Sequence, residues 1–239
     1  MEETTELTIG EMVANNYRTA PVFKKYGIDF CCKGGRTIEA ACAAKNMNPQ
    51  PLIADLAAAV KLKDDSSVDY TTWALDKLAD HIEDEHHRYV EAATEQLLPF
   101  LDKVAKVHGE RHPELLEINR LFKEMAGNLA QHMKKEELIL FPFIRKMVKA
   151  HDAGLATPAP PFGTVQNPIA MMKEEHEAEG DRFELISELS NGYTTPADAC
   201  NTYQVSFALL KEFQDDLHKH IHLENNILFP KALAMESEK

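Results

Sequence analysis

Apolar residues recur at helical spacing along most of the chain. Beyond about residue 70 they fall three or four positions apart, which is the period of an α-helix with one buried face. The pattern predicts four long helices, at about residues 72–107, 113–150, 168–190 and 196–234. The connection at 109–112 is short, which implies antiparallel neighbours, whereas a proline-rich loop precedes the third helix. We therefore expect an all-α fold with an up-and-down four-helix bundle.

The first part of the chain carries shorter helical patterns. Helices are predicted near Leu7, from Ala20 to Gly27, after Thr37 as an N-cap, and over about residues 52–62. A polar, charged stretch without an apolar period follows and is typical of a linker. The predicted organisation is a small helical domain at residues 1–62, a linker at 63–69 and the bundle at 70–236.

One stretch of the bundle occurs twice. The segment HMKKEELILFP recurs 88 positions later as HIHLENNILFP. In each copy a histidine and a glutamate stand four residues apart, as His132 with Glu136 and as His220 with Glu224. On an α-helix this spacing places both side chains on one face, about 6 Å apart along the axis. A metal ion can be held between two such side chains.

Both pairs fall on the apolar stripes of their helices. In the first copy the stripe also includes Met125, Leu129, Ile139 and Phe143. An ionised group in an apolar core is costly without a partner, and a shared cation supplies one. The alternative is an ordinary His–Glu hydrogen bond inside the bundle, but two copies at identical spacing favour the metal site.

The first and third helices offer further histidines. His176 continues the apolar stripe of the predicted third helix and is the single histidine in it. On the first helix His81, His86 and His87 compete, and the apolar periodicity slightly favours His86. Spacing alone leaves the choice between His86 and His87 open.

The remaining histidines are expected away from this centre. His218 and His222 share a face with polar residues, which predicts a solvated face: Lys211, Asp215, Asn225 and Asn226. His108 lies about 30 Å along the helix from the candidates of the first helix, too far to reach the same centre. His112 and His151 lie at helix ends and are expected at the surface.

The number of candidate ligands indicates which metal is bound. Four histidines and two carboxylates converging from four helices are too many for a tetrahedral zinc site. Imidazoles with bridging carboxylates suit a pair of iron ions. We therefore predict two iron ions per chain, oxo- or hydroxo-bridged, with Glu136 and Glu224 spanning them. A ferritin-like centre is disfavoured, because it needs Glu-x-x-His on two helices and only Glu83 with His86 fits.

Two adjacent cysteines, Cys31 and Cys32, precede Lys33 and two glycines in the amino-terminal domain. This setting predicts an exposed, locally electropositive thiol site with a redox or metal-handling role. A disulfide between the two neighbours would be strained and easily reduced. The alternative is a pair of small core residues, which is the favoured interpretation for Cys42 and Cys200.

Composition and charge narrow the class of protein. The formal net charge of −13 argues against nucleic acids and anionic membranes as partners, because both require clustered Lys and Arg. The opening MEETTELTIG is acidic and polar, and no apolar run approaches the ~20 residues of a membrane span. A cytoplasmic protein is therefore expected, with its four cysteines as thiols in a reducing compartment.

With these residues in view, the chain resembles a hemerythrin-type bundle and, more narrowly, the iron–sulfur cluster repair di-iron proteins. The resemblance covers nearly the whole chain and rests on YGIDFCCKGG, DHIEDEHH with the later KVHG, both copies of the repeat and the stretch around His176. It implies four histidine ligands to iron and two bridging carboxylates: His87, His132, His176, His220, Glu136 and Glu224.

The family pattern selects one of the first-helix candidates. Its ligand histidine stands seven residues after the Asp of an Asp-His-Ile motif, which is Asp80 here, and this gives His87. The oxygen-carrying hemerythrins differ in having His-x4-Asp on the fourth helix and a second histidine on the third, where this chain has Gly180. Fewer nitrogen ligands should make the iron more exchangeable and leave room for exogenous ligands.

The resemblance implies repair of iron–sulfur clusters damaged by nitrosative or oxidative stress. In one mechanism the bundle donates iron to damaged iron–sulfur proteins or their assembly machinery, with Cys31 and Cys32 passing metal or docking the target. In a second, the di-iron centre binds and reduces nitric oxide, which would make the protein an enzyme. A third role is that of an oxygen or redox sensor. The sequence leaves the mechanism and the oligomeric state open, a homodimer included.

Overall fold

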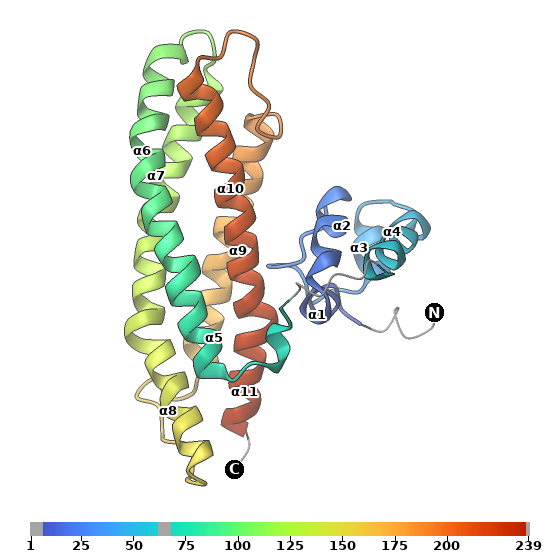
Figure 1. Cartoon of the computed structure of the whole chain (residues 1–239), viewed down its shortest axis with the longest axis vertical. Helices are drawn as coiled ribbons and strands as arrows, with labels where there is room; N and C mark the ends of the chain where they lie inside the picture. Colours follow the sequence, from blue (N-terminus) through green and yellow to red (C-terminus); the bar gives the residue numbers. More distant parts are fainter. Residues whose placement is uncertain (1–6, 62–67, 238–239) are drawn as a thin grey trace.

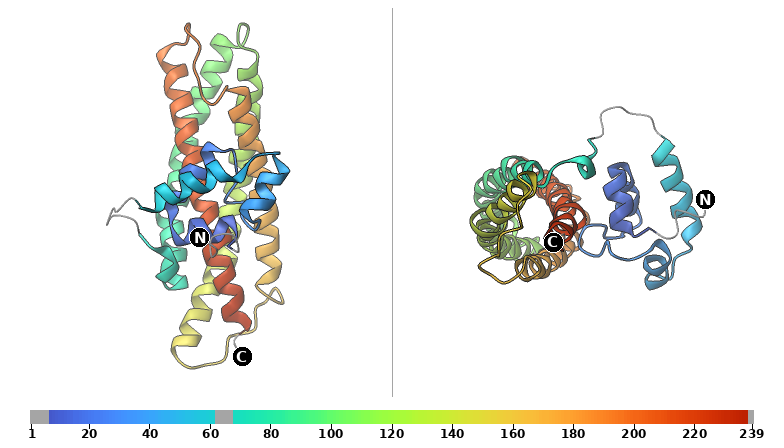
Figure 2. Two further views of the ribbon diagram at one scale, coloured as in Figure 1. Left: turned by 90° about the vertical axis from the view of Figure 1, so that its right-hand side faces the viewer. Right: turned by 90° about the horizontal axis from the view of Figure 1, so that it is seen from below.

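The all-α fold predicted from the periodicity is confirmed. The computed structural model describes residues 7–61 and 68–237, and in this part of the chain the only β-pairing is an isolated bridge between Thr8 and Thr37. Four long helical columns run antiparallel as an up-and-down bundle (Figure 1). A small helical module lies against one side of the bundle, part-way along its length (Figure 2).

Three of the four columns contain a π-helical segment. The first column comprises α5 (Leu75–His81), the π-helix η3 (Ile82–His87) and α6 (Arg88–His108). The second comprises α7 (Glu114–Lys135), the π-helix η4 (Glu136–Leu140) and α8 (Phe141–Asp152). The third is α9 (Gln166–Leu189), and the fourth comprises α10 (Asn201–Leu223), the π-helix η5 (Glu224–Leu228) and α11 (Phe229–Ser237). The fourth column thus begins at Asn201 rather than near Pro196.

The π-helical segments change which side chains point inward. A π-turn holds more residues than an α-turn, so the buried stripe steps forward by an extra position. The α-helical period predicts Ile139 on the buried stripe, but Ile139 is 49% exposed and Leu140 is 1% exposed. The prediction for Ile139 is wrong because the α-helical period does not continue through η4.

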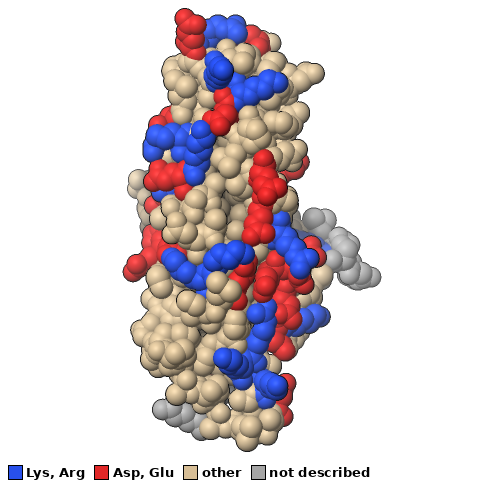
Figure 3. Space-filling model, turned by 90° about the vertical axis from the view of Figure 1, so that its left-hand side faces the viewer, with Lys and Arg blue, Asp and Glu red and all other residues tan. Residues whose placement is uncertain are grey.

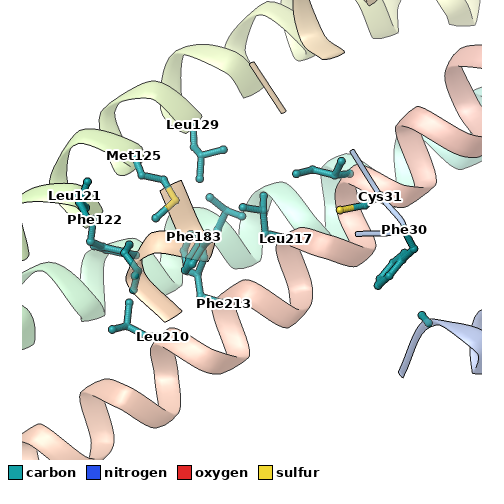
Figure 4. Packing of buried hydrophobic residues seen from close by; sticks show 14 of the residues in the cluster. Phe30, Cys31, Leu121, Phe122, Met125, Leu129, Phe183, Leu210, Phe213 and Leu217 are labelled. Carbon is teal, nitrogen blue, oxygen red and sulfur yellow. The ribbon is translucent and has the colours of Figure 1, made fainter. Parts of the chain in front are cut away.

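The larger apolar cluster joins the bundle to the module. Within the bundle the Phe213 ring packs against Phe122 and Phe183, with ring centroids 5.4 and 5.6 Å away. Phe30 and Cys31 of the module belong to the same cluster and extend it at one end (Figure 4). Burial of this shared apolar surface holds the module on the bundle.

The amino-terminal module consists of short helices whose ends are encoded in the sequence. They are α1 (Ile9–Asn15), the 3₁₀-helix η1 (Tyr17–Thr19), α2 (Ala20–Lys25), α3 (Ile38–Ala44) and α4 (Pro49–Lys61), and a 3₁₀-helix, η2 (Tyr70–Thr72), precedes the bundle. Thr8 and Glu11 form a capping box at the start of α1. The side chain of Thr37 caps α3, as predicted, by accepting from the Ala40 N–H at 3.2 Å.

The predicted domain boundaries stay predictions. The predicted linker at residues 63–69 falls mainly on residues 62–67, which lie outside the described residues. Its last residue, Asp69, accepts from the Thr71 N–H and caps η2.

The module covers a face of α10 that the polar pattern assigned to solvent. His222 is 1% exposed, and His218 is only partly exposed. Asn226 donates from Nδ2 to the Phe30 backbone oxygen at 3.2 Å. The prediction of a solvated face for His218 and His222 is therefore wrong, because the polarity of a face does not reveal that another part of the chain packs on it.

Ion pairs support the same contact. Lys24 of the module pairs with Asp215 of α10, and Lys33 pairs with Asp181 of α9 at 2.9 Å. All four side chains are more than a third exposed, so these pairs orient the module and add little stability.

The face of the bundle opposite the module carries both signs of charge (Figure 3). Neither Lys and Arg nor Asp and Glu gather there into one continuous patch. Within residues 7–61 and 68–237, no helix has the length and apolar character needed to cross a membrane.

Replacing Gly10 by Ala should weaken the contact between module and bundle. A Cβ at this position would lie 2.2 Å from Asn226 Oδ1, so Asn226 would have to move and give up its bond to Phe30. We expect a loss of about 1–3 kcal/mol in the free energy of unfolding, as is typical of overpacking, measured by denaturant titration.

Gly127→Ala is the matched control for this change. No atom lies within 4 Å of a Cβ built at Gly127, and alanine is the better helix former, so this variant should be neutral or more stable. An equal loss of stability in both variants would contradict the role assigned to Gly10.

Candidate metal centre

The ligand atoms of the six candidate residues meet inside the bundle. They form two groups in which every ligand atom lies within 4.8 Å of the others: His87, Glu136, His220 and Glu224, and His132, Glu136, His176 and Glu224. Both groups share the two glutamates, and all six residues, which are called the histidine cluster below, are buried. The arrangement offers two adjacent cation positions, each with two imidazoles, and two carboxylates between them.

The carboxylates lie between the imidazoles of the two groups. Glu224 presents Oε2 to His176 Nε2 at 3.1 Å and Oε1 to His220 Nε2 at 3.2 Å. Glu136 Oε2 lies 3.4 Å from Nε2 of His87 and 3.4 Å from Nε2 of His132. Each glutamate thus reaches one histidine of each group, as a bridging carboxylate must.

Spacing and burial both fit a metal site. His132 Nε2 and His176 Nε2 lie 3.0 Å apart, which matches two adjacent ligands on an octahedral metal with bonds of about 2.1 Å. Imidazole nitrogens lie 3.1–3.4 Å from the carboxylate oxygens of Glu136 and Glu224, but these oxygens and both ring nitrogens of His220 form no hydrogen bond of regular geometry within the described residues. Carboxylates buried without a partner are very costly, and a shared cation removes that cost.

Three of the six residues lie at the ends of π-helical segments. His87 is the last residue of η3, Glu136 is the first of η4 and Glu224 is the first of η5. Single π-turns within α-helices are frequent at functional sites. The wider turn of η3 lets the consecutive side chains of His86 and His87 both be buried, at 3% and 1% exposure.

Side chains outside the cluster orient three of its histidines. In each of the three, the ring nitrogen Nδ1, which faces away from the cluster, is hydrogen-bonded to a side-chain oxygen. His87 bonds Glu137 Oε1 at 3.1 Å, His132 bonds Glu175 Oε2 at 2.9 Å, and His176 bonds Asn225 Oδ1 at 3.0 Å. Such a partner holds a proton on Nδ1 and leaves Nε2 free to bind metal. Nδ1 of His220 has no partner among the described residues. The two cation positions therefore differ in how firmly their ligands are held.

The repeat accounts for part of this outer arrangement. Glu137 and Asn225 occupy equivalent positions in its two copies, directly after the shared glutamates. Each contacts the histidine that a neighbouring column supplies, His87 or His176. The polar pattern assigned Asn225 to a solvated face, which is wrong because Asn225 is buried between His176 and the Cys31 backbone. Glu137 was given no role, although its position directly after a candidate ligand was a usable signal.

Burial and nearby carboxylates shift the pKa values of the cluster histidines in opposite directions. Burial lowers the pKa of His132, but Glu136, Glu175 and Glu224 outweigh it and raise this pKa to about 10. For His220 burial prevails and lowers the pKa. Because an imidazole must give up its proton to bind metal through Nε2, metal affinity at this cluster should fall as the pH falls.

Comparisons with known proteins agree with this geometry. The family described as hemerythrin HHE cation binding domain matches residues 78–232, which contain all six cluster residues, and a domain of unknown function, DUF542, matches residues 5–60. Iron-sulfur cluster repair protein YtfE of Enterobacter sp. is 34% identical over 228 residues, which cover 95% of this chain and 97% of that protein. A probable iron-sulfur cluster repair protein of Haemophilus influenzae is 32% identical over 226 residues, which cover 94% of this chain and 96% of that protein.

The chain belongs to the iron–sulfur cluster repair family. Its resemblance to this family, and to hemerythrin-type bundles more widely, is thereby confirmed. The two matched ranges together include most of the module and of the bundle of this repair-family protein.

In this repair-family protein His87, not His86, lies in the cluster. His86 instead bonds Asp216 Oδ1 through Nδ1 at 2.8 Å, and its ring stacks on His220 with centroids 5.7 Å apart. The apolar periodicity places His86 inward correctly, but η3 turns both histidines inward, and only His87 belongs to a ligand group. The choice of His87 as the ligand stays a prediction.

The other histidines and two of the cysteines lie away from the cluster. His81 stacks on Tyr70, and His151 is exposed. His108 is buried at the far end of the first column, where its Nε2 lies 3.2 Å from Cys200 Sγ. Cys42 is buried as expected, but Cys200 is exposed, so its assignment to the core is wrong.

The double-cysteine loop of the module packs against a histidine of the cluster. Cys32 Sγ donates to the backbone oxygen of His176 at 3.3 Å. A Cβ at Gly180 would lie 3.1 Å from this sulfur, so the absence of a side chain at Gly180 makes room for the thiol. The Cys31 backbone oxygen accepts from Asn225 Nδ2 at 3.2 Å, and Asn225 Oδ1 faces His176 Nδ1. The loop thus contacts the backbone of His176 and, through Asn225, its imidazole.

The predicted exposed and electropositive thiol site is wrong for Cys31. Its side chain is buried, and its Sγ lies 3.3 Å from the Asp29 carboxylate. The hydrogen bond with Cys32, burial and the charge of Asp29 raise the pKa of the Cys31 thiol. Cys32 is partly exposed. Lys33, the expected source of positive charge, pairs with Asp181.

Replacing His87 by Leu should remove metal from the cluster, whereas His86→Leu should leave most of it. His87 presents Nε2 to Glu136 and belongs to one ligand group, but His86 bonds Asp216 and belongs to neither. Metal analysis of both purified variants checks this. Loss of metal from the His86 variant alone would mean that periodicity identified the ligand correctly.

Replacing Asn225 by Leu should weaken metal binding about 10- to 100-fold, the usual effect of removing a side chain that orients a ligand. The change leaves His176 Nδ1 without its acceptor. Affinity is measured by competition with a chelator. Asn226→Leu is the control, because Asn226 bonds Phe30 and His222 and not a cluster histidine. Equal weakening in both variants would show that Asn225 acts only through docking of the module.

Proposed function

We propose that this protein binds two iron ions and repairs iron–sulfur clusters damaged by nitrosative or oxidative stress, by donating iron to them. The observation that carries the proposal is the pair of buried ligand groups that share Glu136 and Glu224. The proposed ligands are His87 and His220 for one ion, His132 and His176 for the other, with the two glutamates and an oxo or hydroxo group bridging them.

The donor set supports iron over zinc. Each position combines two imidazoles with two shared carboxylates, and neutral imidazole with carboxylate suits iron. A single tetrahedral zinc ion would use four ligands and leave two of these buried side chains without a partner. When bound, iron supplies the ions that a damaged cluster has lost. The repair role is supported by the two iron–sulfur cluster repair proteins that match nearly the whole chain.

Donation requires that iron can leave, and the two positions differ in this respect. His132 and His176 are both held by outer hydrogen bonds. At the other position His87 is held by Glu137, but Nδ1 of His220 has no partner among the described residues. Loss of an outer partner typically weakens metal binding 10- to 100-fold. The His87–His220 position is therefore the better candidate for the ion that is released.

Cys31 and Cys32 are proposed as the thiols that pass metal or dock the damaged protein. They line a pocket of about 310 Å³ on the module side of the bundle. Cys32 is partly exposed and touches the backbone of His176. Thiolates are soft ligands of the kind that hold iron in iron–sulfur clusters.

The test follows labelled iron from this protein to a damaged target. The protein is loaded with isotopically labelled iron and mixed anaerobically with a cluster-depleted dehydratase. We expect about two irons per chain at the start, and loss of label from this protein in step with its appearance in the dehydratase and recovery of activity. Cys31→Ser/Cys32→Ser should keep its iron but repair slowly, whereas Cys42→Ser, which lies away from the cluster, should behave as the wild type.

Three results would contradict the proposal. Zinc in preference to iron, or about one metal per chain, would refute the di-iron centre. Retention of all label while the dehydratase recovers would refute donation, and consumption of nitric oxide under the same conditions would then favour the enzymatic alternative. Unchanged repair by the double Ser variant would remove the thiols from the mechanism.

A further inference from the structure

A second group of metal-ligand atoms lies outside the histidine cluster, in the double-cysteine loop. Asp29, Cys31 and Cys32 present a carboxylate oxygen and two sulfurs, all within 4.8 Å of one another. The two sulfurs lie 3.7 Å apart, and Asp29 Oδ1 lies 3.3 Å from Cys31 Sγ. Two thiolates on one tetrahedral metal, with bonds of about 2.3 Å, lie about 3.8 Å apart. The sulfurs already have the spacing that a single ion requires.

The loop is held in this shape by bonds that do not use the sulfurs. Asp29 Oδ1 accepts the backbone N–H groups of Cys31 and Cys32, both at 2.9 Å. Asn225 holds the Cys31 backbone oxygen from the bundle side. A ligand set whose backbone is already fixed loses little conformational freedom when an ion binds.

The surroundings of these atoms favour a cation. The three residues line the pocket of about 310 Å³, together with the carboxylates of Glu184 and Glu188 and that of Asp181, which is paired with Lys33. One lysine, Lys24, also lines it, but its ammonium group is paired with Asp215. A pocket lined with carboxylates attracts a cation, and its open space leaves a coordination position for water or for a ligand from another molecule.

We propose that Asp29, Cys31 and Cys32 form a separate site for one divalent transition-metal ion, open on its fourth side. The two thiols give up their protons to solvent as the ion binds, and the ion takes their place between the sulfurs. Two sulfurs and one oxygen select ferrous iron or zinc over magnesium and calcium, which prefer oxygen ligands. This inference rests on the proposed function only for the identity of its cargo, which in repair would be ferrous iron.

The test uses the full-length protein with its histidine cluster already loaded with iron. Cobalt(II) is titrated in under anaerobic conditions with a phosphine reductant, because thiolate ligation gives it a charge-transfer absorption that histidine and carboxylate ligands do not. We expect this band to saturate at one cobalt per chain without loss of iron. Cys32→Ser should abolish the band, and Asp29→Asn, which keeps an acceptor for the two backbone N–H groups, should weaken binding at least about tenfold.

Two thiol controls and the iron content decide among the outcomes. Cys42→Ser and Cys200→Ser remove the other two cysteines and should leave the band unchanged. Iron content is measured in every sample, so loss of the fold is distinguished from loss of the new site. A band that survives Cys32→Ser, or cobalt that only displaces iron without a thiolate band, would overturn the inference. If the histidine cluster bound no iron, the band would still report on the thiol site by itself.

Discussion

The burial of two carboxylates at the centre of a four-helix bundle is the constraint on which the rest of the structure depends. Glu136 and Glu224 are fully buried, and their oxygens lie 3.1–3.4 Å from imidazole nitrogens without a hydrogen bond of regular geometry among the described residues. Such groups are tolerated in a core only when positive charge surrounds them. Four imidazoles, one pair from each side, provide the ligands that share a cation with them. Outer carboxylates and an amide then hold three of these rings in place.

The internal repeat makes the centre nearly symmetric, and one departure from symmetry connects it to the module. The residue after the shared glutamate is Glu137 in one copy and Asn225 in the other. Glu137 only accepts, whereas the amide of Asn225 accepts from His176 and also donates to the Cys31 backbone oxygen. The change from acid to amide therefore connects one half of the cluster to the module. The other half has no such connection in the described residues, and His220 lacks an outer partner there.

The module is built to bring its cysteines close to the cluster without supplying a ligand to it. Small residues on both sides allow this approach. A Cβ at Gly180 would meet Cys32 Sγ, and a Cβ at Gly10 would meet Asn226 Oδ1. Phe30 and Cys31 add to the apolar cluster, which offsets the entropy lost on docking. The proposed thiol site in the module and the histidine cluster in the bundle therefore share one hydrogen-bond network but offer a metal ion different ligand atoms.

The sequence alone determined the bundle, the repeat and five of the six candidate ligands, because helical period and i, i+4 spacing are local properties of a chain. Family spacing added His87, which periodicity had ranked below His86. Three outcomes depended on the tertiary structure: the inward turn of both histidines in η3, the burial of His222, and the contact of Cys32 with His176, 144 residues away in the chain. Periodicity reports which face of a helix is apolar. It assumes an unbroken α-helical turn and cannot show which distant segment packs on a polar face, and this is why the predictions for Ile139, His218 and His222 failed.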